Sequence, residues 1–249
     1  MSSPAARAGL ETLFLDAGGV LVHPSWTRIA AALARQGVSV DPTALERADP
    51  IAKHELDVAH EIRQTTDAAR APRYLERVLA HAGVRGAARA MELALTEVRD
   101  YHARENLWED VPAEVVPALG RLRAAGLRLV VVSNANGRLR AAFDRIGLTP
   151  HLDDIIDSSE VGYEKPDPVI FQLALSRAGS EPGRAAHVGD LYHVDVVGAR
   201  AAGVRGVLLD AAGLYGRYDC PRVASVDALA TLVEAGDPRP FGSAPPVPA

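Results

Sequence analysis

The feature that most constrains the fold of this chain is a regular alternation of helical segments and short apolar runs along residues 109–237. Helices are expected at residues 113–125, 137–146, 168–178 and 194–202, and strands at 127–132, 154–157, 185–188 and 206–209. One more apolar run, at residues 10–15, is expected to form a strand near the start of the chain. Strands that alternate with helices form a parallel sheet with helices on both faces. The sequence therefore predicts an α/β fold built on a doubly wound parallel sheet.

Residues 25–104 interrupt this alternation. Ala, Leu, Arg and Glu recur there at helical spacing, and no convincing strand pattern occurs. Asp41-Pro42 and Ala71-Pro72 are expected to start helices, because proline fits the first turn of a helix. We therefore expect a block of about four or five helices.

These patterns divide the chain into a core and an insert. The core is expected to comprise residues 10–22 and 109–237, and the helical insert residues 23–108. Residues 1–9 and 238–249 are rich in Pro, Gly, Ser and Ala and are expected to be flexible tails.

Polar residues stand where three of the expected strands end. Asp16 follows the first apolar run, Ser133 and Asn134 follow the strand at 127–132, and Asp190 follows the strand at 185–188. Ligands of doubly wound sheets bind beyond the carboxyl ends of the strands. We therefore expect these side chains to share one site.

Lys165 is notable because the chain uses almost no lysine. Of its 27 basic residues, only Lys53 and Lys165 are lysine. A compact ammonium differs from the planar guanidinium of arginine, and it suits a place between a carboxylate and a phosphate. A lysine in this arginine-biased chain therefore indicates a site that needs an ammonium group.

In order, Asp16, Ser133, Lys165 and the pair Asp190 and Asp195 resemble the four motifs of the haloacid dehalogenase-like hydrolase superfamily, most closely its phosphatases with a helical cap. The resemblance implies a Rossmann-like core, with the helical insert as a cap domain that closes over the site and excludes water.

The resemblance also implies roles for these residues. Asp16 would be the nucleophile that attacks phosphorus and forms an aspartyl-phosphate. Ser133 and Asn134 would hold phosphate oxygens, and Lys165 would neutralise the phosphate and the nucleophile together. The implied substrate is a small phosphorylated metabolite.

A bound Mg²⁺ is implied as well, held by Asp16, by the backbone carbonyl of Gly18 and by Asp190. These are hard oxygen donors of the kind that Mg²⁺ prefers. Asp195 would orient the metal ligands or the lysine. By itself, Asp195 is equally well explained as a carboxylate that stabilises the first turn of a helix.

Gly18 departs from the family pattern, because phosphatases of this superfamily usually carry a second Asp there that protonates the leaving oxygen. Such acid–base help is typically worth about 10²–10⁴-fold in rate. Three explanations are open: a substrate with a good leaving group, another acid, or feeble activity. His23 is the nearest candidate acid, since imidazole titrates near neutral pH, although an ordinary loop histidine also fits that position.

Three other functions stay open. Phosphonoacetaldehyde hydrolase also lacks the acid Asp and uses a cap lysine, here Lys53, to form a Schiff base, but it usually has Arg where Lys165 stands. The 2-haloacid dehalogenases lack that Asp and need no metal, whereas the motif at Asp190 resembles a metal site. The third is a catalytically silent member of the superfamily that binds a phosphometabolite. Such a protein would have no chemical reason to keep Asp16, Ser133, Lys165 and Asp190 together.

Composition limits the remaining choices. A net charge of -5 leaves no basic stripe for nucleic acid, so no such partner is expected. Cys220 is the only cysteine, which excludes an intrachain disulfide and suits a reducing cytosol. Neither a signal-peptide pattern nor a membrane-length apolar run occurs, so we expect a cytoplasmic protein without a membrane partner. A monomer and a homodimer are both compatible with the sequence.

Overall fold

The computed structural model describes residues 9–242, and the chain divides into two compact units. Unit 1 comprises Met1–His23 and Val111–Ala249, and unit 2 comprises Pro24–Asp110. Unit 2 covers nearly the same residues as the expected helical insert, and its action as a cap stays a prediction.

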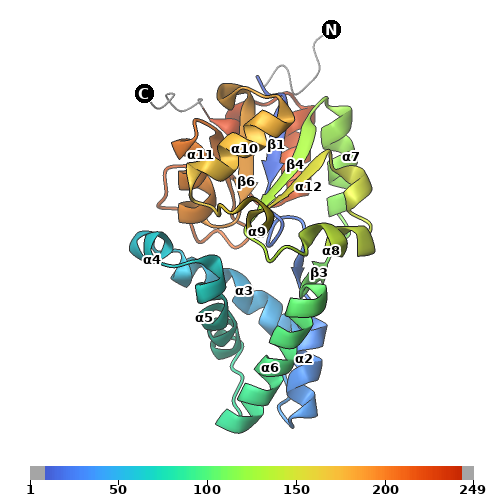
Figure 1. Ribbon diagram of the computed structural model, residues 1–249, viewed down its shortest axis with the longest axis vertical. Helices are drawn as coiled ribbons and strands as arrows, with labels where there is room; N and C mark the ends of the chain where they lie inside the picture. The colour runs from blue at the N-terminus through green and yellow to red at the C-terminus, as the bar shows by residue number, and fades with distance from the viewer. Residues whose placement is uncertain (1–8, 243–249) are drawn as a thin grey trace. The chain divides into compact units, whose positions relative to one another are not determined.

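The sheet of unit 1 contains six parallel strands among the described residues, in the order β5-β4-β1-β6-β7-β8. Figure 1 shows the middle of this sheet, with β1 between β4 and β6. The strands are β1 (Thr12–Leu15), β4 (Arg128–Ser133), β5 (Asp154–Asp157), β6 (Ala185–Gly189), β7 (Arg205–Leu209) and β8 (Arg222–Val223). β1 lies between β4 and β6, with Leu13 opposite Leu129 on one side and Ala186 on the other. The predicted doubly wound parallel sheet is therefore confirmed.

Helices cover both faces of this sheet. They are α7 (Val115–Ala124), α8 (Leu139–Arg145), α9 (Ser158–Val161), α10 (Pro168–Ala178), α11 (Val197–Ala201) and α12 (Val226–Glu234). α10 and α11 bury a common apolar cluster against one face, which includes Phe14 and Phe171. α7 and α12 pack together on the other face, where Arg121 forms ion pairs with Asp227 and Glu234.

The sequence of α10 explains its limits. Asp167 caps its start by accepting a hydrogen bond from the Val169 N–H at 2.9 Å, and Pro168 occupies the first turn. Gly179 ends the helix in the left-handed conformation, with φ of 60°. The helix buries a stripe formed by Ile170, Phe171, Ala174, Leu175 and Ala178.

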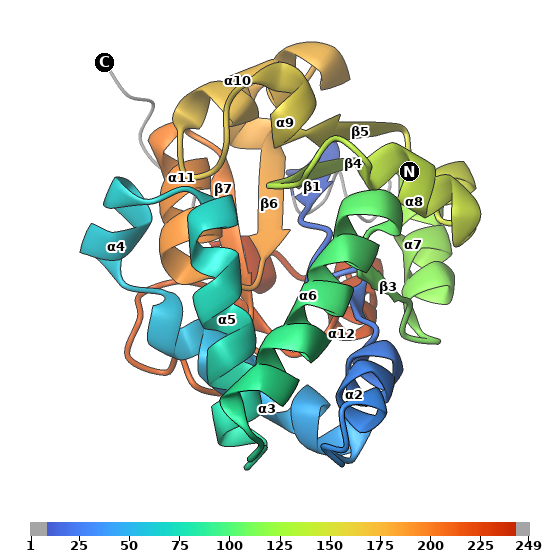
Figure 2. The ribbon, with the colours of Figure 1, turned by 60° about the horizontal axis from the view of Figure 1, so that its bottom comes forward.

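Unit 2 is helical, apart from β3 (Trp108–Asp110) and Pro24, the second residue of β2 (His23–Pro24); β2 and β3 form a two-stranded sheet. Its helices are α2 (Trp26–Arg35), α3 (Pro42–Leu56), α4 (Ala59–Gln64), α5 (Asp67–His81) and α6 (Ala88–Glu105). α3 packs on α5, and α2 packs on α6 (Figure 2). The apolar cluster of this unit includes buried Leu33, Leu45 and Val78. Across residues 9–242, every helix is too short or too polar to cross a bilayer.

One of the two predicted helix starts is confirmed, and the other is wrong. Asp41 caps α3 by accepting a hydrogen bond from Thr43 N–H at 3.0 Å. Pro72, in contrast, lies inside α5, which begins earlier, after the N-cap Thr66. A proline inside a helix removes one backbone hydrogen bond. The apolar face of α5 outweighs this loss by burying Tyr74, Leu75, Val78 and Leu79.

The expected helix at 194–202 has two parts, a π-helix, η3 (Tyr192–Val196), followed by α11. Three 3-10 turns complete the described chain: η1 (Thr149–His151), η2 (Pro182–Arg184) and η4 (Arg239–Phe241). η4 falls within the expected C-terminal tail, yet its Phe241 is only 1% exposed. Of the residues expected in tails, 1–8 and 243–249 lie outside the described part.

Candidate active site

Three of the predicted site residues meet at the carboxyl edge of the sheet. Asp16 directly follows β1, Ser133 ends β4, and Asp190 directly follows β6. Leu15, the last residue of β1, pairs with Val131 of β4 and Val188 of β6. The parallel register therefore brings three polar positions from distant parts of the sequence to one edge.

Asp16 is held from both its main chain and its side chain. Its N–H donates to the Val188 carbonyl at 2.9 Å, and its Oδ1 accepts from Ala17 N–H at 2.7 Å. The Lys165 Nζ lies 2.9 Å from the same Oδ1. Among the described residues both side-chain contacts of Asp16 fall on Oδ1, which leaves Oδ2 for chemistry.

A tight loop follows Asp16. Leu21 and Val22 both donate their N–H to the Ala17 carbonyl, and Gly19 N–H donates to the Val22 carbonyl at 2.8 Å. Gly19 has a φ of 79°, which explains a glycine at that position. Gly18 lies beside it at a negative φ, so its lack of a side chain has no such backbone reason.

Lys165 bridges two carboxylates inside the protein. Its Nζ lies 2.9 Å from Asp16 Oδ1 and 2.7 Å from Asp195 Oδ1, and the residue is 1% exposed. Burial alone would lower the pKa of Lys165, but the charges of Asp16 and Asp195 raise it above its usual value. Lys165 is therefore a fixed cation at neutral pH.

Asn134 holds the backbone of Lys165. Its Oδ1 accepts from Lys165 N–H at 2.7 Å, and its Nδ2 donates to the Lys165 carbonyl at 2.9 Å. The sequence assigned Asn134 to phosphate binding, and that contact stays a prediction. The structure gives Asn134 a second task, because both polar atoms of its side chain contact the residue that supplies the cation.

Asp157, which the sequence analysis did not select, anchors the loop after Ser133. Its Oδ2 accepts from Gly137 N–H at 2.9 Å, and the neighbouring Ser158 Oγ accepts from Ala135 N–H at 3.1 Å. The available signal in the sequence was a carboxylate at the end of the apolar run of β5, the strand that pairs with β4 and places Asp157 opposite Ser133. These bonds fix the course of the chain beside the phosphate-binding candidate.

Asp190 and Asp195 complete an acidic cluster with Asp16. Each of the three offers one carboxylate oxygen, and these oxygens lie within 4.8 Å of one another. Asp195 is fully buried on η3, where Lys165 and His187 contact its Oδ1 and Leu191 N–H donates to its Oδ2 at 3.0 Å. Asp16 and Asp190 are the more accessible members, so they are the ones that could hold a cation.

The charge of Asp195 is stabilised from within the protein. Burial would raise the pKa of this carboxyl group, but the charge of Lys165 and the hydrogen bond from His187 lower it well below its usual range. Gly189 provides the room, since a Cβ there would lie 2.0 Å from Asp195 Cγ. His187 was missed by the sequence analysis, although a histidine inside an apolar strand next to Gly189-Asp190 was visible.

Two other predicted residues belong to different elements of the chain. His23 begins β2, at the boundary of the two units, and its role as an acid stays a prediction. Lys53 belongs to unit 2, where its Nζ lies 3.1 Å from Asp49 Oδ2. Tyr74 also donates to Asp49, at 2.6 Å. An ammonium paired in this way is poorly suited to attack an aldehyde, because a Schiff base needs the neutral amine.

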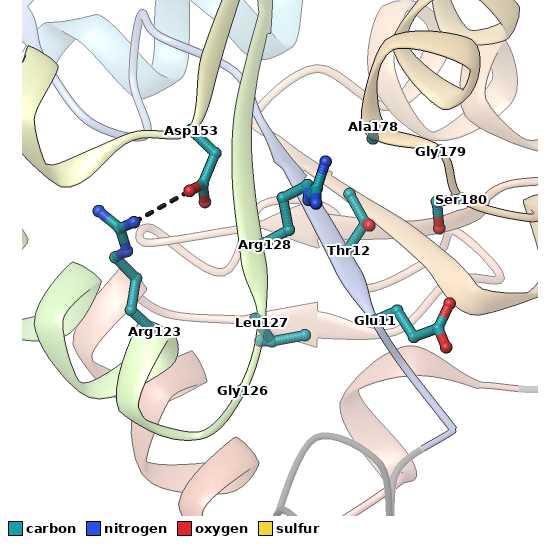
Figure 3. A pocket seen from close by; sticks show the side chains of 10 residues that line it. All are labelled: Glu11, Thr12, Arg123, Gly126, Leu127, Arg128, Asp153, Ala178, Gly179 and Ser180. Atoms are coloured by element: carbon teal, nitrogen blue, oxygen red, sulfur yellow. Dashed lines mark hydrogen bonds and ion pairs between the residues drawn. The ribbon is translucent and has the colours of Figure 1, made fainter.

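A separate cavity of about 480 Å³ lies at the opposite edge of the sheet (Figure 3). It is lined by Thr12 and Arg128, where β1 and β4 begin, and by an ion pair of 2.9 Å between Arg123 and Asp153. Acidic and basic groups are balanced around it. The acidic cluster lies at the other ends of these strands, so the cavity is not part of the candidate active site.

Comparisons with known proteins identify the family. A family model described as haloacid dehalogenase-like hydrolase matches residues 10–203. The chain is 41% identical over 122 residues to haloacid dehalogenase-like hydrolase domain-containing protein 3 of Homo sapiens, an alignment that covers 48% of this chain and 49% of that protein. It is 40% identical over 123 residues to phosphoserine phosphatase of Thermus thermophilus, with 49% and 47% covered. The chain thus spans about half the length of the curated relatives it matches.

A solved structure supports the fold over a longer stretch. A 2-haloacid dehalogenase from Pseudomonas syringae pv. Tomato superposes with a TM-score of 0.53 and 25% identity, covering 91% of this chain and 98% of that one.

Proposed function

Because the chain belongs to the haloacid dehalogenase-like hydrolases, we propose that it is a magnesium-dependent phosphatase that acts on a small phosphorylated metabolite. The observation that carries this proposal is the buried Lys165 ammonium, in contact with both Asp16 and Asp195. A fixed cation beside a carboxylate is suited to neutralise a phosphate that approaches that carboxylate. The relative named phosphoserine phosphatase further supports chemistry on phosphate esters.

The reaction would proceed in two steps. Asp16 Oδ2 attacks phosphorus while the bond to the leaving oxygen breaks, which leaves the phosphoryl group on Asp16. Water then attacks this aspartyl-phosphate, releasing phosphate and regenerating the carboxylate. Lys165 stays protonated throughout and offsets the negative charge that builds up on the phosphoryl oxygens. The Ser133 hydroxyl would donate a hydrogen bond to one of those oxygens.

The acidic cluster fits Mg²⁺. Asp16 and Asp190 of this cluster would hold the ion. The Gly18 carbonyl would add a third hard oxygen atom of the kind that Mg²⁺ prefers. When bound, Mg²⁺ would offset the charge of the substrate phosphate. Asp195 already accepts hydrogen bonds on both oxygens, which suits it to orient Lys165.

Gly18 narrows the substrate class. Glycine cannot protonate a leaving alkoxide, so we favour substrates whose leaving group needs no acid, such as aryl, acyl or anhydride phosphates. Protonation by His23 is the other route, and replacing His23 with Ala would test it through the pH–rate profile.

A small substrate panel tests the proposal. p-Nitrophenyl phosphate, acetyl phosphate and glycerol 3-phosphate would be assayed with Mg²⁺ and with EDTA, and Asp16→Asn would serve as the inactive control. We expect turnover of the aryl and acyl phosphates that depends on Mg²⁺ and is lost in Asp16→Asn. Absence of turnover, or full activity in EDTA or in Asp16→Asn, would contradict the proposal.

The rival activities have their own readouts. Chloride release from 2-chloropropionate without Mg²⁺ would favour dehalogenation, and borohydride trapping with phosphonoacetaldehyde would favour a Schiff base at Lys53. We weight the phosphatase above both, because Lys53 is ion-paired and the acidic cluster suits a cation. The cytoplasmic location and the monomeric or dimeric state stay predictions.

A further inference from the structure

His187 is a buried polar residue to which the proposed mechanism gives no task. It lies in β6, directly opposite Phe14 of the central strand, and is 0% exposed. Its ring packs edge-on against Phe171, with the centroids 4.9 Å apart. A polar ring in such apolar surroundings is costly unless it is hydrogen-bonded. The identity of its partner therefore matters.

That partner is Asp195. The His187 Nε2 lies 2.9 Å from Asp195 Oδ1, whereas Nδ1 has no hydrogen-bond partner among the described residues. Burial lowers the pKa of His187, so the ring is neutral and carries one N–H. Since the Asp195 carboxylate can only accept, the proton belongs on Nε2, and His187 is the donor.

Asp195 Oδ1 is also the atom that holds Lys165. Lys165 Nζ reaches it at 2.7 Å, and the same Nζ reaches Asp16 at 2.9 Å. A continuous chain of contacts therefore runs from His187 through Asp195 and Lys165 to the candidate nucleophile. Every member except Asp16 is buried.

We propose that His187 is a positioning residue that fixes the Asp195 carboxylate and thereby holds the Lys165 ammonium against Asp16. The expected effect on kcat rests on the proposed function, whereas the expected displacement of Lys165 does not. Without the Nε2–H donor, Asp195 keeps the bond from Leu191 to Oδ2 but loses one of the two donors that fix Oδ1. The carboxylate can then turn, and Lys165 follows it, because Asp195 is its shorter contact.

The low lysine content makes this displacement directly observable. The chain contains only Lys53 and Lys165, so protein labelled with ¹³C,¹⁵N-lysine gives two sets of side-chain NMR signals. His187→Gln places an amide N–H near the position of Nε2, whereas His187→Asn is one methylene shorter and cannot reach Asp195. Both variants have a polar side chain, so a difference between them reports the hydrogen bond to Asp195 and not the polarity of residue 187. Phe171→Leu alters packing against the ring and serves as the control.

We expect His187→Asn to shift the Lys165 signals and leave those of Lys53 in place, with His187→Gln close to wild type. With p-nitrophenyl phosphate and Mg²⁺, we expect His187→Asn to lower kcat about 10–100-fold, since misplacement by about 1 Å can cost 10²-fold, with KM changed less. His187→Gln should recover most of kcat.

Two results would overturn the inference: unshifted Lys165 signals in His187→Asn, or an equal shift in Phe171→Leu, which would mean that packing alone is responsible. If the Lys165 signals behave as expected but the wild-type protein hydrolyses no phosphate ester, the positioning of Lys165 stands and the proposed function fails. If His187→Asn does not fold, the Lys165 signals of His187→Gln and Phe171→Leu are compared instead. The inference requires wild-type Lys165 signals in His187→Gln, which keeps a donor to Asp195.

Discussion

Replacing Lys165 with methionine should destabilise the protein strongly and in a pH-dependent way. Methionine keeps the length and apolar stem of lysine but removes the ammonium. Asp195, which is fully buried, then keeps its negative charge without the cation that balances it, and Asp16 loses its contact as well. An unbalanced buried charge is one of the few causes of a large loss of stability from a single substitution.

The expected magnitude follows from this burial. Removing one partner of a buried ion pair costs about 3–5 kcal/mol, whereas an exposed pair contributes about 0–1 kcal/mol. Lys165 has a relative side-chain exposure of 1% and Asp195 of 0%, so the larger range applies. We therefore expect Lys165→Met to lower the free energy of unfolding by about 3–5 kcal/mol at pH 8.

The pH dependence has a definite sign. In the wild type, the lowered pKa of Asp195 gives stability that is present above about pH 4 and is lost as the pH falls further. Without Lys165, burial would raise the pKa of Asp195, so the folded variant would take up a proton more readily than the unfolded chain. The stability gap between Lys165→Met and the wild type should therefore narrow from pH 8 to pH 5.

Urea unfolding followed by circular dichroism, in EDTA, measures this gap. Lys53→Met is the matched control, because the second lysine is also ion-paired but its partner Asp49 keeps the hydrogen bond from Tyr74. We expect a smaller loss for this control. A loss below about 1 kcal/mol for Lys165→Met at pH 8, or a gap that is equal at pH 5 and pH 8, would refute the reasoning.

Three further substitutions test other parts of the site. Gly18→Asp is compatible with the backbone, because φ is not positive at this position. It should raise kcat for glycerol 3-phosphate about 10²-fold or more and change kcat for p-nitrophenyl phosphate less. Equal effects on kcat for both substrates would argue against a missing acid. Gly189→Ala puts a Cβ 2.0 Å from Asp195 Cγ and should cost about 1–3 kcal/mol in a thermal unfolding assay, unlike Gly216→Ala, where the added Cβ meets open space. Asn134→Ala frees the backbone of Lys165 and should cost about 1–2 kcal/mol and lower kcat; unchanged kcat would show that Lys165 needs no such support.

Much of the core was predictable because its signals are local or follow from register. The strands β1, β4 and β6 are short apolar runs, and parallel pairing brings the residues at their carboxyl ends to one edge. For this reason Asp16, Ser133 and Asp190 could be grouped from the sequence alone. The cap of α10 by Asp167 is equally local, since it needs only the residues that follow it.

The parts that could not be predicted depend on how side chains turn within the fold. A histidine in a buried strand does not reveal in sequence which side chain its ring meets, so the bond between His187 and Asp195 was missed. Asn134 was assigned to phosphate from its place after a strand, whereas its bonds to Lys165 arise from a loop far along the chain. The π-helix that carries Asp195 and the two-residue strand β8 are too short to produce a periodic pattern.

The position of β1 sets the order in which the protein can be completed during synthesis. This strand leaves the ribosome before unit 2, whereas the two strands that it pairs with, β4 and β6, are translated only after the whole of unit 2. Unit 2 is one continuous stretch of sequence and can begin to collapse before the strands that pair with β1 have been made. Asp16, which follows β1, therefore gains its contact with Lys165 and its neighbouring carboxylates only after residues 165–195 are translated, so a chain halted after unit 2 would contain the candidate nucleophile without the residues that surround it.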